Sequence, residues 1–70
     1  MRELGEKMRK AREKSGVSIY EMADVCGVSP ICLVNIEKGT IICPAEILIT
    51  YAEMIGIPID EIVHGDTDHM

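Results

Sequence analysis

Two helix starts and two helix stops fall within residues 18–39, and this spacing constrains the fold more than any other feature of the sequence. Ser18 and Glu21 have the spacing of a capping box, in which each side chain binds a backbone N–H at the start of a helix. Gly27 stands where that helix would end in a left-handed residue, a conformation that glycine adopts without a steric penalty. The segment therefore predicts a short helix over about 19–26.

A second helix follows directly. Ser29 suits the N-cap, and Pro30 suits the first helical position because its φ angle is already helical and it lacks an N–H group. Gly39 provides the second stop. The sequence thus predicts a helix over 30–38, separated from the first by a tight turn. The residues expected to face the core from these two helices are Met22, Ala23, Cys26, Leu33 and Ile36.

A helix is also predicted before this pair. Leu4, Met8 and Ala11 recur at helical spacing and form a narrow apolar stripe over residues 3–14. Lys7, Lys10 and Lys14 share this segment, and they fit a solvated face better than a clamp on phosphates.

Two more helices are predicted after the pair. Pro44 begins one that Gly56 ends, and a short helix follows over roughly 59–64. Ile47 and Ile49 lie off the inner stripe and need other cover. No strand-like alternation occurs, so the expected fold class is an all-α bundle of five helices in one domain, 1–65. The residues expected to face inward from the last two helices are Ala45, Leu48, Tyr51, Ala52, Ile55, Ile59, Ile62 and Val63.

The cysteine pattern and the length of the apolar runs exclude several classes of protein. Cys26, Cys32 and Cys43 are odd in number and form no C-x-x-C, so neither a disulfide framework nor a zinc site is indicated. We expect Cys26 to be a small buried apolar residue. No signal peptide opens the sequence, and the longest apolar run is far too short to span a membrane. These features predict a cytoplasmic domain with no membrane association.

The end of the chain and the set of polar residues argue against cofactors and catalysis. Residues 66–70 are expected to form a disordered acidic tail. His64, Asp66, Asp68 and His69 could chelate a metal, but such residues are common in flexible tails, so no metal and no cofactor are predicted. No Ser/His/Asp set, carboxylate pair or glycine-rich phosphate loop is placed to converge, and we do not expect an enzyme.

The charge is unevenly distributed along the chain. Its net value is −5, which argues mildly against a nucleic-acid partner. Residues 1–14, however, hold six basic and three acidic residues, a net charge of +3. Residues 15–70 hold only Lys38 against nine acidic residues, a net charge of −8. The amino-terminal segment could approach phosphates, whereas the remainder would repel them.

Taken in register, several short motifs resemble one known family. They are Leu4-Gly5, Ala23, Gly27-Val28-Ser29, Ile36-Glu37-Lys38-Gly39 and Ala52 followed by Gly56. Over about residues 4–64 the sequence resembles the Cro/C1-type (XRE family) helix-turn-helix DNA-binding domain. The resemblance implies a lambda-repressor-like five-helix bundle whose third helix lies in the DNA major groove. It also implies an ion pair between Arg12 and Glu37. Members of the family are usually transcriptional regulators that bind operators as dimers, so the resemblance implies that role as well.

Carrying the family pattern over residue by residue exposes departures. Ile19 stands where relatives often carry a glutamine that touches a phosphate. Of the base-reading positions, Asn35 offers a bidentate bond to adenine, whereas Ile31 offers only apolar contact, for example with a thymine methyl. The DNA-binding residues implied by the resemblance are Ser29, Pro30, Ile31, Val34, Asn35, Lys38 and Thr40.

Two functions remain open at this point. The first is a sequence-specific DNA-binding transcriptional regulator that binds duplex DNA as a homodimer through the helix 30–38. The second is the same fold with a depleted DNA-reading face. Such a protein would act as an interaction module, an anti-repressor or co-regulator, because Ile19, Ile31 and Val34 form an exposed apolar face that fits a protein partner. Dimerisation is expected because the chain has more isoleucine than one small core needs.

Overall fold

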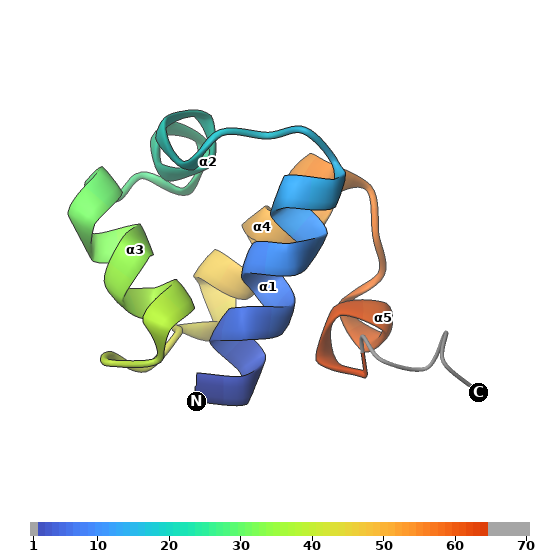
Figure 1. The fold of residues 1–70 in the computed structure, drawn as a ribbon. Helices are drawn as coiled ribbons and strands as arrows, with labels where there is room; N and C mark the ends of the chain where they lie inside the picture. Colours follow the sequence, from blue (N-terminus) through green and yellow to red (C-terminus); the bar gives the residue numbers. More distant parts are fainter. Residues whose placement is uncertain (1, 65–70) are drawn as a thin grey trace.

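The computed structural model describes residues 2–64, which form five α-helices joined by short connections (Figure 1). The helices are α1 (Arg2–Lys14), α2 (Ile19–Cys26), α3 (Pro30–Lys38), α4 (Ala45–Ile55) and α5 (Ile59–Val63). The described residues contain no strand. The predicted all-α, five-helix class is confirmed, and the predicted bounds of α2 and α3 match. The other three helices each differ from the prediction by one residue at one end.

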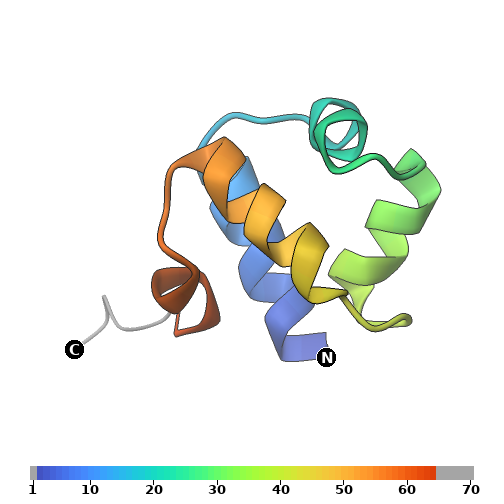
Figure 2. The ribbon, with the colours of Figure 1, turned by 180° about the vertical axis from the view of Figure 1, so that it is seen from behind.

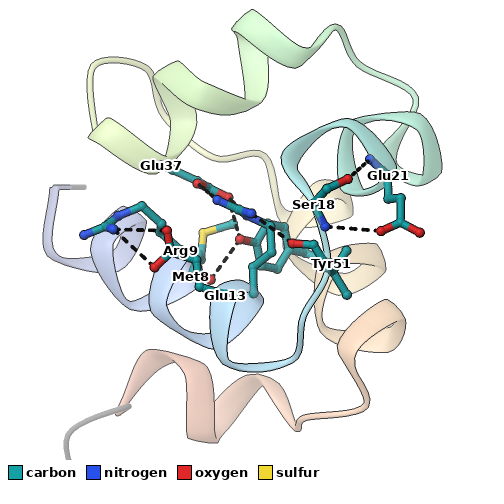
Figure 3. A network of polar contacts seen from close by, with 9 residues as sticks. Met8, Arg9, Glu13, Ser18, Glu21, Glu37 and Tyr51 are labelled. Carbon is teal, nitrogen blue, oxygen red and sulfur yellow. Dashed lines mark hydrogen bonds and ion pairs between the residues drawn. The ribbon is translucent and has the colours of Figure 1, made fainter.

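Local capping explains why α2 and α3 were predictable. The Ser18 hydroxyl accepts a bond from the Glu21 backbone N–H at 3.0 Å, and the Ser18 N–H donates to the Glu21 carboxylate at 3.2 Å (Figure 3). Gly27 has a φ of 73°, the left-handed value that ends α2. The Ser29 hydroxyl accepts from the Cys32 N–H at 3.1 Å and caps α3. Each of these signals acts within three or four residues of the helix end that it fixes.

Loss of the Ser18 cap should weaken the domain measurably. A Ser18→Ala variant is expected to lose about 1 kcal/mol of the free energy of unfolding, because the Glu21 N–H then lacks its acceptor. In a domain of this size that corresponds to a fall in Tm of roughly 4–8 °C. Thermal unfolding followed by circular dichroism measures it. Ser15→Ala makes the same chemical change outside the capping box, and an equal loss in both variants would contradict the capping role.

Helix α1 lies in the middle of the arrangement. It packs against α3 on one side and against α5 on the other, while α2 packs against α3 and α4 (Figures 1 and 2). Helices α2 and α3 meet at a bend of 102°. This value lies within the range of two helices joined by a tight turn in DNA-binding motifs.

The core is aliphatic and small. Its buried members come from all five helices and are Met8, Met22, Ala23, Leu33, Ile36, Tyr51, Ala52 and Ile62. One predicted core position is wrong, because Ala45, the first residue of α4, is exposed. Cys26 is partly buried and packs against the core. Of the two isoleucines off the α4 stripe, Ile47 packs against the core, whereas Ile49 remains 46% exposed.

Gly5 permits the closest approach between two helices. A Cβ atom at this position would overlap the backbone carbonyl oxygen of Glu37 and would lie 2.6 Å from that of Ile36. Real side chains do not come so close to backbone atoms. The missing side chain at Gly5 therefore lets α1 lie directly against the carboxyl end of α3.

Two further predictions concern the membrane and the end of the chain. Within residues 2–64, no single helix has the length and apolar character needed to cross a membrane. The bent α2–α3 pair, taken together, meets the length and composition criteria for a span, but it has no other feature that points to a membrane. The predicted tail 66–70, with Asp66, Asp68 and His69, lies outside the described residues.

Candidate nucleic-acid interface

The outward face of α3 carries the residues predicted to touch DNA. Ile31, in the first turn, is 71% exposed, and Ser29, Pro30 and Lys38 are also exposed. Val34 and Asn35 are half-buried. The opposite face of α3 is fixed in the core by Leu33 and Ile36, which are 0% and 2% exposed. The helix is thus anchored from beneath and open to solvent along its outer side.

Thr40 has a role within the fold. Its backbone N–H and its hydroxyl both bond to the carbonyl oxygen of Asn35, at 3.0 and 3.1 Å. Both donors of Thr40 are therefore engaged in ending α3, and as placed it has no free donor for a phosphate. These bonds use only the backbone of Asn35, so they leave its side-chain amide available. The Ser29 hydroxyl accepts one bond as the α3 cap and keeps its own hydrogen for donation.

A buried polar network holds α3 at a fixed angle to α1 and α4. The Arg12 guanidinium donates to both carboxylate oxygens of Glu37, at 2.8 and 3.0 Å, and to the Val17 carbonyl at 2.9 Å. The Tyr51 hydroxyl lies 2.6 Å from the Glu37 carboxylate and 2.8 Å from the Met8 carbonyl (Figure 3). Glu37 is 4% exposed. The ion pair implied by the family resemblance is present, and Tyr51 extends it to a third helix.

The network shifts the pKa values of Arg12 and Tyr51. The hydrogen bonds from Arg12 to Glu37 raise the pKa of the guanidinium, although burial opposes that change. Burial, together with the bond to Glu37, raises the pKa of the Tyr51 phenol. Arg12 therefore stays charged and Tyr51 stays protonated at any physiological pH. The Arg12 and Tyr51 contacts are therefore a lasting structural element of the fold.

A cleft of about 510 Å³ opens between α1, the start of α2 and α3. Its lining residues are Glu6, Arg9, Arg12, Ile19, Val34, Glu37 and Lys38. Ile19 and Val34, predicted to form an exposed apolar face with Ile31, instead line this cleft and are half-buried. Only Ile31 of the three projects freely. Sequence reasoning missed Arg9 and Glu6, because nothing local indicates which flank of α1 faces α3.

The basic residues of α1 point in different directions. Lys7 donates to the Val63 carbonyl at 2.8 Å and so holds the end of α5. Lys10 and Lys14 are exposed and do not line the cleft. Arg9 lines it, and its guanidinium lies 3.4 Å from both carboxylate oxygens of Glu13 in an exposed contact. The predicted set Lys7, Lys10 and Lys14 therefore does not act as one group.

Two of the cysteine thiols, Cys26 and Cys43, are not activated. Burial raises the pKa of the Cys26 thiol and, as the main cause, that of Cys43. A raised pKa lowers the fraction of thiolate, which is the reactive form. Within residues 2–64, moreover, no group of His, Cys, Asp and Glu side chains is arranged to hold a metal ion.

Comparisons with known proteins agree with the geometry. The helix-turn-helix domain family matches residues 5–66. In structure, the chain is similar to the clp gene regulator ClgR from C. glutamicum, with a TM-score of 0.86 and 26% sequence identity. That alignment covers 99% of this chain and 90% of the other.

A second similarity is confined to a small part of a larger protein. The chain is 36% identical over 64 residues to a glutamine–fructose-6-phosphate aminotransferase (isomerizing) of Methanocaldococcus jannaschii. The match covers 90% of this chain but only 6% of that protein. The aminotransferase activity in that name is a property of a protein of which this chain spans a small fraction.

Proposed function

This chain belongs to the helix-turn-helix domain family, and from that premise we propose that it is a sequence-specific transcriptional regulator that binds duplex DNA with α3 in the major groove. One observation carries the proposal: α3 is fixed on its inner side by Leu33, Ile36 and Glu37, and its outer side faces solvent. A helix of this diameter fits the major groove of B-DNA. A regulator that binds chromosomal DNA is located in the cytoplasm of a bacterial or archaeal cell.

The outer side of α3 favours A·T pairs. The amide of Asn35 offers the donor and acceptor that match the major-groove edge of adenine. Ile31, exposed in the first turn, offers an apolar surface for the methyl group of thymine. Ser29 and Lys38 lie at the two ends of the helix and supply donors for phosphates, which set the position of the helix without reading sequence.

We propose that the protein binds as a homodimer. Four large apolar side chains on or near α4 remain exposed: Ile41, Ile42, Ile49 and Met54. Ile42, in the connection between α3 and α4, is 73% exposed. Exposed apolar side chains on a small domain commonly mark an interface where they gather in one patch. A two-fold dimer would also present two copies of α3 to two half-sites of an operator.

A second candidate is a protein-interaction module with the same fold. Two observations favour it: the net charge is −5, and the apolar Ile31 on the reading face is 71% exposed. In that case a partner regulator, or a second copy of this chain, would cover the outer side of α3.

A DNA titration separates the two candidates. Binding of a mixed-sequence duplex at about 50 mM salt, weakening steeply as salt rises to about 200 mM, is expected for the regulator. An Asn35→Ala variant should then lose about 1–3 kcal/mol of discrimination at one A·T pair of a selected site. Thr50→Ala on α4 removes a comparable polar group and should keep the preference. Absence of duplex binding even at low salt would favour the interaction module.

A further inference from the structure

The cleft beside α3 has a distinct chemical make-up. Ile19 and Val34 give it an apolar floor, and Arg9 and Lys38 bring two cations to it from α1 and α3. Of the carboxylates in its lining, Glu37 is already bonded to Arg12 and is 4% exposed, so its charge is neutralised locally. Glu6 is exposed. The available charge in the cleft is therefore positive, in a chain whose net charge is negative.

Arg9 is free to change partners. Its contact with Glu13 is long, at 3.4 Å, and both side chains are about half exposed, at 43% and 55%. Exposed pairs of this kind contribute little to stability, because solvent screens them and both long side chains must be ordered. Arg12, by contrast, is committed to its buried pair with Glu37. Of the α1 cations with described side chains, Arg9 alone both lines the cleft and lacks a strong partner.

The position of the cleft relates it to the groove that α3 would occupy. Val34 and Lys38 belong to α3 and line the cleft. A helix about 10–12 Å across fills a major groove about 12 Å wide, so the sugar–phosphate chains that wall the groove lie immediately beside the helix. The cleft opens directly beside α3, on the side of α1 and the start of α2.

We propose that this cleft receives one sugar–phosphate strand of the bound duplex. Arg9 and Lys38 neutralise its phosphates, while Ile19 and Val34 contact the apolar faces of the deoxyriboses. Glu6 opposes the phosphates and limits affinity. The proposal rests on the proposed DNA binding, and it assigns a phosphate contact to Arg9. It also gives a role to Ile19, which departs from the polar residue usual in relatives.

The salt dependence of duplex binding tests this role. Each neutralised phosphate contributes about −0.9 to the slope of log affinity against log salt concentration. Arg9→Gln should therefore reduce the steepness by about 1 and weaken binding about eightfold at about 0.1 M salt. Lys10→Gln is the matched control, since it removes the same charge from an exposed neighbour outside the cleft. It should leave the slope almost unchanged.

A second pair of variants tests the opposing carboxylate. Glu6→Gln should strengthen duplex binding severalfold, whereas Glu3→Gln, on α1 but outside the cleft, should strengthen it less. Three of the four altered residues are exposed and the fourth, Arg9, is about half exposed, so circular dichroism should show the unchanged helical fold. Equal effects within each pair would mean that only overall charge matters. That result would overturn the cleft as a strand site while leaving DNA binding intact. Failure of the unaltered protein to bind duplex at about 50 mM salt would overturn both proposals.

Discussion

An Arg12→Met variant is expected to lose about 3–5 kcal/mol of the free energy of unfolding, because removing one member of a buried ion pair leaves the other charge without compensation. Glu37 would keep only the Tyr51 hydroxyl as a side-chain partner, and the Val17 carbonyl would lose its donor. Domains of this size have a total stability of roughly 4–10 kcal/mol. The variant should therefore be partly unfolded at 37 °C. Urea denaturation at 15 and 25 °C gives the value.

Two further variants separate the buried pair from a general loss of charge. Arg9→Met removes the same type of side chain from an exposed contact with Glu13, and it should cost less than about 0.5 kcal/mol. The double variant Arg12→Met, Glu37→Met should recover part of the stability lost by Arg12→Met alone, because no buried charge then remains unpaired. If Arg12→Met were as stable as Arg9→Met, the network would not hold α1 and α3 together.

A Gly5→Ala variant is expected to be less stable than the unaltered protein, although alanine is the better helix former. The propensity gain is about 1 kcal/mol. Overpacking against rigid neighbours costs about 3 kcal/mol at its upper range, and here the neighbours are backbone carbonyls of Ile36 and Glu37. The expected net loss is about 2 kcal/mol. Because α1 must move away from α3, Gly5→Ala should also weaken the Arg12–Glu37 bonds, and thermal unfolding measures the combined effect.

Gly27→Ala is the matched comparison for the Gly5 prediction. Gly27 has a φ of 73°, but a Cβ there would meet no atom within 4 Å. Its replacement therefore measures backbone strain alone, about 1–2 kcal/mol. Gly5, by contrast, lies in a regular helix with no positive φ to strain, and its replacement measures the overlap with α3 against the gain in helix propensity. A Gly5→Ala variant more stable than the unaltered protein would show that the two helices separate without cost.

The parts of the fold that depend on neighbouring residues were predictable. Ser18 with Glu21, and Ser29 with Pro30, give the starts of α2 and α3, because an N-cap acts on donors two or three residues away. Ala45 was misplaced for a different reason. It has the spacing of the α4 stripe, but spacing along one helix does not say where the neighbouring helices end, and the first residue of α4 projects past them.

The contacts that shape the interface were less accessible to sequence reasoning. The Arg12–Glu37 pair followed only from the family resemblance. Tyr51 reaches partners fourteen and forty-three positions away, and Lys7 reaches Val63 across fifty-six positions, so no periodicity reveals them. The same limit applies to Arg9. Whether it faces α3 or solvent depends on the rotation of α1, which the close approach at Gly5 and the burial of Met8 determine together.

The Arg12–Glu37–Tyr51 network has a consequence for how such a protein changes its target. Because α3 is locked to α1 and α4 from beneath, its tilt does not depend on the outward residues Ile31 and Asn35. The side chains at those positions can therefore be exchanged without changing how the helix is held. Under the proposed DNA binding, substitutions at those positions would change the sequence that α3 reads and would leave the orientation of the helix unchanged.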